Sequence, residues 1–263
     1  MSRKYGRNPV RRLLKMPSLG DFLDQAAVWP PVPAKGWENA VSDWGMLGNG
    51  PDPGNPPAMP DGVGDCAEAG ILHLIKGQSA NAGNPLTATT AQALALYSTI
   101  TGFNPNDPST DNGTALTDLL TFIQKNGVEM TDATGKKVTV EVVGSASLDI
   151  SSAAQMRYSG YTFGGNYLGI NCPQQCEDDT DNWNFAAGLS IAGGHCIPQE
   201  GEGAAGGKIV SWDMVIPAST GFLISYLEEA YIVITKAWLN AQGKSPTGLD
   251  LNSLVAAMKG LTA

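Results

Sequence analysis

The sequence predicts an α+β protein with two lobes, a helical one followed by a β-rich one. Residues 1–60 are irregular and rich in Pro and Gly, and apolar residues at helical spacing, interrupted by Asn and Gly breaks, then dominate from Cys66 to about residue 125. From residue 137 onward, apolar and polar residues mostly alternate, as they do in half-buried strands. Because helical patterns come first and strand patterns follow, the two kinds of element are expected to form separate lobes.

The first lobe is expected to contain three helices. Pro and Gly residues break the segment before Cys66, Asp65 is a good N-cap, and an apolar run then continues until Gly77. The second helix ends at a loop rich in Asn, Asp and Pro, and Asn-Gly stops the third. The predicted helices cover residues 66–76, 90–101 and 114–125.

The second lobe is expected to alternate strands with a few helices. Strands are predicted at residues 137–143, 161–170, 194–199, 207–215 and 230–235, and helices at 151–159, 219–229 and 250–260. These patterns suggest the following division: a basic arm at 1–28, and a domain at 29–263 with a helical lobe at about 60–130, a β lobe at about 131–240 and the C-terminal helix.

Charge is distributed unevenly along the chain. The net charge is −9, yet the charged side chains among the first fifteen residues are all basic. An acidic body argues against general nucleic-acid binding, whereas the arm suits an acidic partner, nucleic acid or a neighbouring subunit. The alternative is a solvated, mobile terminus that folding does not need. The basic residues of the arm are Arg3, Lys4, Arg7, Arg11, Arg12 and Lys15.

No segment of the sequence suggests membrane insertion or secretion. No run approaches the ~18 apolar residues of a membrane helix, and no apolar signal-peptide core follows the basic start of the chain. The expected location is therefore the cytoplasm of the host or a virus particle assembled there.

Cys66 and His195 are the leading candidates for chemistry. Cys66 stands at the predicted start of a helix, and His195, one of only two histidines, follows roughly 130 residues later. A helix N-terminus and a nearby imidazolium both stabilise the thiolate, which is the nucleophilic form of cysteine. The backbone N–H of Cys66 is expected to help hold an oxyanion. The alternative is that Cys66 is a small buried residue of a core helix.

The other histidine and cysteines are expected to be structural. His73 lies two helical turns beyond the candidate nucleophile, too far for a catalytic base, and is expected in the core or between the lobes. Cys172 and Cys176 leave three alternatives open: a local disulfide, half of a metal site, or two free thiols close together at the surface. Cys196 is expected to point away from the cleft.

No cofactor and no metal site are predicted. The glycine-rich run at residues 201–207 lacks the preceding strand and following helix of a phosphate-binding loop, and indicates a hairpin. The acidic loops near residues 107–111 and 178–181 lack the ligand spacing and closing glutamate of an EF-hand. Solvated loops are therefore expected at both places.

After residue 28 the chain resembles the papain-like cysteine peptidases, which implies their two-lobed fold. The resemblance rests on the stretch ending at Asp43-Trp44, on Gly64-Asp65-Cys66 as the nucleophile turn, on Gly193-Gly194-His195 as the histidine strand, and on Ser211-Trp212. A closer resemblance is to uncharacterised papain-like proteins of bacteria and bacteriophages. The N-terminal region is expected to be too short for the long inhibitory pro-segment of lysosomal relatives.

Two departures from the family pattern bear on activity. The family's second oxyanion donor, a glutamine, is matched by Asn49, which an insertion has moved upstream; the alternative for Asn49 is a turn-forming role. The family's orienting asparagine is matched by Val210, so Ser211 or Asp213 would have to orient His195. If Val210 keeps the asparagine's orientation, neither neighbour is expected to face the histidine.

The expected function is hydrolysis of a peptide, isopeptide or other amide bond by the Cys66–His195 dyad. One alternative is a non-catalytic papain-like protein that is a structural or decorating component of a phage particle. A second alternative is a phage-borne amidase that acts on a non-protein amide. The expected partners are a protein or peptide substrate, or neighbouring virion proteins bound through the basic arm, and no membrane.

Overall fold

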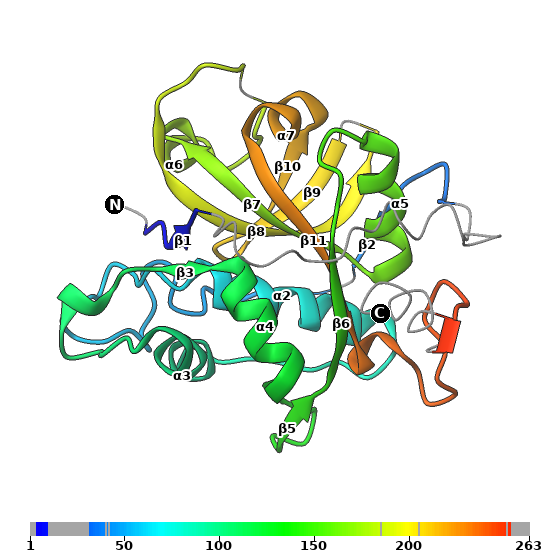
Figure 1. Cartoon of the computed structure of the whole chain (residues 1–263), viewed down its shortest axis with the longest axis horizontal. Coiled ribbons are helices and arrows are strands. Elements are labelled where there is room, and N and C mark those ends of the chain that lie inside the picture. Colours follow the sequence, from blue (N-terminus) through cyan, green and yellow to red (C-terminus); the bar gives the residue numbers. More distant parts are fainter. Residues whose placement is uncertain are drawn as a thin grey trace.

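The structure is a computed structural model in which a helical lobe lies against a β-rich lobe (Figure 1). This arrangement confirms the predicted α+β class. No helix among the described residues is long and apolar enough to cross a bilayer. The residues that the structure describes are 4–9, 32–39, 41, 43–184, 186–204, 206–250 and 252–253.

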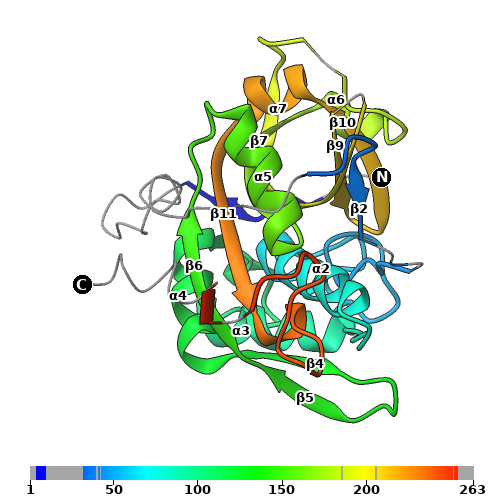
Figure 2. The same cartoon turned by 90° about the vertical axis from the view of Figure 1, so that its right-hand side faces the viewer.

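Helix α2 (Cys66–Asn81) runs through the middle of the molecule, between the two lobes (Figure 2). It begins at Cys66, as predicted, and is buried on all sides as far as Ser79. The predicted end at Gly77 is wrong. A Cβ atom on Gly77 would lie only 2.1 Å from Glu200 Oε2, so this glycine allows close packing against the β lobe and does not end the helix.

Helices α3 (Thr90–Thr101) and α4 (Leu116–Asn126) complete the helical lobe. Thr89 and Gln92 form a reciprocal capping box at the start of α3, and Gly102 ends it with a positive φ of 77°. These local signals explain why the predicted bounds of α3 are confirmed. The same part of the chain contains η1 (Pro108–Thr110), β3 (Thr114–Ala115), β4 (Val128–Thr131) and β5 (Lys137–Val140).

The β lobe is built on one seven-stranded sheet. Its strands are β2 (Trp37–Glu38), β6 (Val142–Ser147), β7 (Asn166–Pro173), β8 (Ile191–Gly203), β9 (Gly206–Ser211), β10 (Met214–Ser219) and β11 (Leu227–Thr235). They follow the order β10-β9-β8-β7-β11-β6 with antiparallel neighbours, and β2 pairs with β8 outside this path. Strands β8 and β9 are consecutive antiparallel neighbours, as the predicted hairpin requires.

Three of the predicted strands are wrong in detail. The stretch 137–143 is divided at Glu141 between β5 and β6, which belong to different sheets. The stretch 161–170 begins inside a helix that ends at Phe163, and the stretch 207–215 is interrupted at Trp212. A positive φ of 59° at Trp212 reverses the chain, which makes two strands of one. The predicted helix at 250–260 lies almost entirely outside the described residues. The remaining helices are α5 (Ala153–Phe163), α6 (Gln175–Asp178), α7 (Thr220–Tyr226) and η2 (Lys236–Trp238).

The two largest apolar cores among the described residues have different roles. One lies within the β lobe around Trp183, and the other joins α2 and α4 to sheet residues such as Tyr167. The side chain of Gln78, in α2, donates hydrogen bonds to the backbone carbonyls of Phe163 and Val233. Because the helix is tied to the sheet in this way, its N-terminal end is held at a fixed position against the β lobe.

Candidate active site

Cys66 is the first residue of α2 and is 1% exposed. The backbone N–H groups of Gly6 and Cys196 donate hydrogen bonds to its thiol. Burial raises the pKa of the Cys66 thiol to about 12, and the two N–H donors offset this only in part. In this arrangement Cys66 is therefore a protonated thiol.

His195 lies in β8, directly before Cys196, whose backbone N–H donates to the Cys66 thiol. Its Nε2 atom lies 2.9 Å from Ser211 Oγ, on the neighbouring strand β9. The indole of Trp212 stacks on the imidazole, with ring centroids 5.1 Å apart and planes 23° from parallel. The hydroxyl and the indole together fix the orientation of the imidazole ring.

The geometry distinguishes between the two candidates for the orienting residue. Ser211 faces His195, whereas Val210 is buried and pairs with Val215 across the β9–β10 ladder. Asp213 is exposed in the turn between the two strands. The alternation rule itself holds between Val210 and Ser211. Because Ser211 is the residue that faces His195, Val210 does not take the orientation of the family's asparagine.

Residues 4–9, here called the terminal segment, lie across this site between the two lobes (Figure 1). Strand β1 (Arg7–Asn8) pairs in parallel with β3, and Thr114 N–H donates to the Gly6 carbonyl at 2.6 Å. The expectation of a solvated arm is therefore wrong for these six residues. The other residues of the expected arm lie outside the described part of the chain.

Gly6 is the tightest contact of the terminal segment with the body. A Cβ atom on Gly6 would lie 1.6 Å from Gly64 O, and one on Gly113 would lie 1.9 Å from Gly6 O. No larger residue fits this slot without displacing backbone. The neighbouring Tyr5 ring meets His195 edge-on, with ring centroids 5.7 Å apart. The segment thus covers the cysteine and the histidine together.

Two basic side chains anchor the terminal segment. The Arg7 side chain is 1% exposed, and its Nη1 and Nη2 atoms lie 2.7 Å from Glu229 Oε1 and 2.5 Å from Glu228 Oε2. Lys4 Nζ lies 3.8 Å from Asp111 Oδ2, with the lysine side chain 48% exposed. The buried arginine pair is therefore the main electrostatic anchor, and the lysine pair is a weaker one.

Asn49 is brought to the nucleophile turn in spite of its distance along the chain. Val63 N–H donates to Gly48 O at 2.9 Å, and Asn49 Nδ2 donates to Val63 O at 3.1 Å. The same amide lies beside the Asp65 carboxyl group and lowers its pKa, against the larger effect of burial. Since the amide is engaged in holding the turn, its role as an oxyanion donor stays a prediction.

Three carboxyl groups are buried beside the start of α2: Asp65, Glu68 and Asp111. Burial and then repulsion by Glu68 raise the pKa of Asp65, and its side chain does not form the predicted N-cap. Burial also raises the pKa of Glu68 to about 8, although Thr114 Oγ1 donates to it at 2.7 Å. Where Asp65 and Glu68 are ionised, they raise the pKa of the Cys66 thiol further, but their effect is smaller than that of burial.

The other histidine and cysteines have structural surroundings. His73 Nε2 lies 2.9 Å from Gly45 O, and burial lowers the pKa of His73 to about 3. All four cysteines are free and buried. Cys172 and Cys176 are neighbours, as expected, but they lie in the β-lobe core and not at the surface. Cys196 Sγ packs against α2. Among the described residues, no cluster of three or more His, Cys, Asp or Glu side chains is placed to hold a metal ion.

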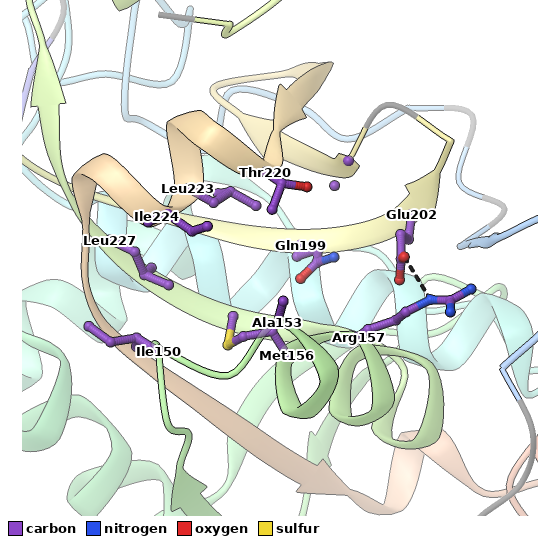
Figure 3. Close-up of a pocket in the computed structure, with 12 residues that line it drawn as sticks. Ile150, Ala153, Met156, Arg157, Gln199, Glu202, Thr220, Leu223, Ile224 and Leu227 are labelled. Carbon is purple, nitrogen blue, oxygen red and sulfur yellow. Dashed lines mark ion pairs between the residues drawn. The ribbon is translucent and has the colours of Figure 1, made fainter. Parts of the chain in front are cut away.

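A pocket of about 150 Å³ lies on the β lobe between α5, α7 and β8 (Figure 3). Its walls are mainly apolar, with Leu223 and Ile224 on one side and the Arg157–Glu202 ion pair of 2.8 Å at its rim. None of the candidate catalytic residues lines it. It contains no nucleophile with a neighbouring base, so it is not a second candidate for catalysis.

The terminal segment is the part of the site that sequence reasoning missed. Its residues show no apolar periodicity that would predict packing against the body. The available signal was charge: Lys4 and Arg7 are basic, whereas their partners Asp111, Glu228 and Glu229 lie in the acidic body. That asymmetry suggested an acidic partner outside the chain, whereas Lys4 and Arg7 pair with acidic residues of the same chain.

Comparison with solved structures identifies the fold as papain-like. Xylellain, a cysteine protease from Xylella fastidiosa, is similar over 89% of this chain and 98% of its own, with a TM-score of 0.59 and 9% identity. Procathepsin B S9 from Trypanosoma congolense is similar over 88% of this chain and 86% of its own, with a TM-score of 0.55 and 11% identity. Procathepsin L 3 from the larval midgut of Tenebrio molitor is similar over 88% and 76%, with a TM-score of 0.52 and 12% identity.

These likenesses confirm the two-lobed papain-like fold. No family model and no curated protein matches the sequence. The predicted closeness to proteins of bacteriophages is not tested by these neighbours.

Proposed function

We propose that this chain is a cysteine hydrolase that cleaves peptide or related amide bonds, with Cys66 as nucleophile and His195 as general base. One observation carries the proposal: Cys66, the first residue of α2, lies against strand β8, which bears His195. The backbone N–H of Cys196, the residue after His195, donates to the Cys66 thiol. The papain-like fold supports the proposal, because xylellain, on the same fold, is a cysteine protease.

The Ser211 contact is compatible with the protonation pattern that the proposal needs. If Nε2 of His195 carries the proton and donates it to Ser211 Oγ, the lone pair is on Nδ1. Nδ1 then accepts the proton of the Cys66 thiol, and the thiolate attacks the acyl carbon. A serine hydroxyl both donates and accepts, so it selects this tautomer less strictly than an amide carbonyl would.

The remaining steps use groups at the start of α2. The backbone N–H of Cys66 lies in the first turn, where it helps to hold the oxyanion of the tetrahedral intermediate, and Asn49 is the predicted second donor. The His195 imidazolium returns the proton to the leaving amine, which leaves a thioester on Cys66. Water then attacks the thioester, His195 takes its proton, and the acid is released as the thiol reforms.

Catalysis requires the terminal segment to move away, because it occupies the space over Cys66 and His195. Departure of the segment exposes the thiol to water and removes the burial that raises its pKa. We therefore propose that the chain is inactive while the terminal segment covers Cys66 and His195, and active when that segment is displaced.

Activity of an opened variant tests this proposal. The opened variant carries Gly6→Ala and Arg7→Ala in the full chain, which removes the fit against Gly64 and the buried ion pairs together. We expect it to hydrolyse fluorogenic peptide amides, and we expect the addition of Cys66→Ala to abolish turnover. Circular dichroism and a cooperative melt confirm that each variant is folded. A folded opened variant that cleaves no amide or ester would contradict the proposal.

A catalytically silent papain-like protein is the second candidate. The buried, protonated Cys66 and its acidic surroundings favour it, because both oppose formation of the thiolate. The proposed role in a phage particle and the proposed phage-borne amidase rest on the resemblance in sequence alone. An opened variant that is silent on all acyl substrates, together with full biological function of Cys66→Ala, is the result that this candidate predicts.

A further inference from the structure

Arg7 of the terminal segment fills a recess at the edge of the candidate active site. We propose that this recess, formed by Asn171, Glu228 and Glu229, is a guanidinium-binding subsite, and that the chain acts on peptides with an arginine at the position that Arg7 now occupies. The claim that such peptides are cleaved rests on the proposed hydrolase function. The claim that the recess binds a guanidinium group does not depend on it.

The recess presents acceptors on two sides of one planar guanidinium group. Arg7 Nη1 donates to Glu229 Oε1 at 2.7 Å, and Nη2 donates to Glu228 Oε2 at 2.5 Å. Nη2 also donates to Asn171 Oδ1 at 3.2 Å. A flat group with several fixed N–H donors satisfies such a set, whereas the single ammonium of a lysine does not.

The acceptors are held in place by their own neighbours. Tyr231 OH donates to Glu229 Oε2 at 2.7 Å, which leaves Oε1 directed at the guanidinium. Asn171 Nδ2 donates to Glu228 Oε1 while Asn171 Oδ1 accepts from Arg7. Burial opposes ionisation of Glu228, but hydrogen bonds from Arg7 and Asn171 outweigh it and lower the pKa of that carboxyl. The recess is thus organised around a cation.

Two glycines make room for the arginine stem. A Cβ atom on Gly169 would lie 2.8 Å from Arg7 Cδ, and one on Gly194 would lie 2.4 Å from Arg7 O and 3.3 Å from Arg7 Nε. Any side chain at either position would narrow the passage that the stem and its backbone now fill. These glycines lie on β7 and β8, and Gly194 directly precedes His195.

The position of the recess relative to Cys66 indicates recognition of a substrate. Gly6, adjacent to Arg7, donates its backbone N–H to the Cys66 thiol, so the arginine lies one residue from the point of chemistry. Within the described residues, Arg7 is the only cation found paired with Glu229, whose side chain is 5% exposed. Departure of Arg7 would leave this carboxylate buried without its cation, which is costly unless another cation enters.

The peptide of residues 4–9 serves as the binding probe. We expect the opened variant with Cys66→Ala to bind this synthetic peptide, as measured by isothermal calorimetry. Replacing the peptide's arginine by citrulline, which keeps the shape and removes the charge, should weaken binding about tenfold or more. Glu229→Gln in the same protein should remove most of this difference. Equal binding of the arginine and citrulline peptides would overturn the proposal.

Hydrolysis gives a second, separable readout. The probes are peptide amides that carry arginine, lysine or citrulline at each of the positions before the scissile bond, and the opened variant with intact Cys66 is the enzyme. We expect one position at which kcat/KM for arginine exceeds that for citrulline about tenfold or more, with lysine between them. Glu229→Gln should collapse that ratio. Cleavage of all the probes at similar rates overturns the subsite and leaves the hydrolase function standing.

Selective binding without any hydrolysis supports the subsite and contradicts the proposed function. If the double substitution prevents folding, Arg7→Ala alone is used, because it empties the recess and removes the buried ion pairs that anchor the terminal segment over Cys66. The same two peptides are then compared for their ability to slow alkylation of Cys66. If only the arginine peptide slows alkylation of Cys66, the proposal is supported. If both peptides slow it equally, or if neither does, the proposal is overturned.

Discussion

The two histidines lie in regions that look alike by simple measures and differ in what surrounds them. His73 is 2% exposed and His195 is 1% exposed, and the Nε2 atom of each lies 2.9 Å from an oxygen atom. Each ring also lies near a tryptophan, Trp44 edge-on at 5.8 Å and Trp212 stacked at 5.1 Å. Burial, one hydrogen bond and one aromatic neighbour therefore do not separate a structural histidine from a candidate catalytic one.

The difference lies in the partner atom and in the covering segment. His73 meets a backbone carbonyl, which only accepts, and it lies within the central helix among permanent core contacts. His195 meets the Ser211 hydroxyl, which both donates and accepts, and it lies beneath a terminal segment anchored by polar contacts. A catalytic base needs a partner with which it can exchange a proton, and of these two histidines only His195 contacts a hydroxyl group. Access of a substrate to His195 further depends on the proposed displacement of the terminal segment.

Loss of His195 is expected to give the largest effect. In the opened variant, His195→Ala should lower kcat/KM by roughly 10²–10⁴-fold, because general-base catalysis is lost while substrate binding remains. The matched control is His73→Gln, which changes the buried histidine of the same chain. It should change the melting temperature but leave kcat per folded molecule within about twofold. A large drop in kcat for His73→Gln would break the comparison.

Alkylation of Cys66 is expected to show the next largest effect. In the wild-type chain the thiol should react slowly with iodoacetamide at pH 7, because its pKa is raised to about 12 and it is covered. The opened variant should react roughly a hundredfold faster, since exposure restores a larger thiolate fraction. Cys172, Cys176 and Cys196 serve as internal controls and should remain slow, as measured by peptide mass spectrometry. Labelling of Cys196 before Cys66 would contradict the role given to the terminal segment.

The pH dependence of the free energy of unfolding tests the structural role of His73. The pKa of His73 is lowered to about 3 in the folded chain from 6.5 in the unfolded chain, so the unfolded state binds the extra proton between these values. The His73 contribution is therefore complete above pH 6.5 and is lost as the pH falls toward 3. His73→Gln should flatten this part of the urea-unfolding profile by roughly a few kcal/mol. A difference between wild type and variant that does not depend on pH would show that His73 is not neutral in the fold.

Substitution of Val210 is expected to affect stability only. In the papain-like pattern Val210 matches the orienting asparagine, and this match predicts that Val210→Asn raises turnover. In the structure Ser211 already contacts His195, and Val210 is buried. Val210→Asn should thus bury an amide without partners and lower the free energy of unfolding by about 1–3 kcal/mol, measured in urea. A gain in kcat would instead support the match of Val210 to the family's orienting asparagine.

Local patterns predicted much of the fold because the signals for its elements are local. The start of α2 follows from the Pro and Gly breaks just before it, and both ends of α3 follow from caps that lie within a few residues. Gly77 was misjudged because its reason to be glycine is Glu200, on a strand far along the chain. The break at Trp212 was missed because a positive φ at a non-glycine residue has no signature in sequence.

The candidate site was predictable in its two main residues and not in its cover. Cys66 and His195 are recognisable because their chemistry demands particular residue types in a particular order along the chain. Ser211 could not be chosen over Asp213 without the turn that exposes the aspartate. The terminal segment depends on pairing between the start of the chain and β3, a contact across a long sequence distance that periodicity does not encode.

The Lys4–Asp111 ion pair is expected to give the smallest effect, and it tests whether the terminal segment is held by general charge attraction or by the Arg7 recess. Lys4 Nζ lies 3.8 Å from Asp111 Oδ2 and the lysine is half exposed, so water and salt screen the pair. Lys4→Ala should speed alkylation of Cys66 by less than about threefold, whereas Arg7→Ala should speed it far more. Raising the salt concentration should reduce the Lys4 effect further and leave most of the Arg7 effect, because the Arg7 side chain is 1% exposed. If Lys4→Ala instead released the segment as fully as Arg7→Ala, attraction between the basic terminus and the acidic body would be sufficient to cover the site, and the recess would have no special part in it.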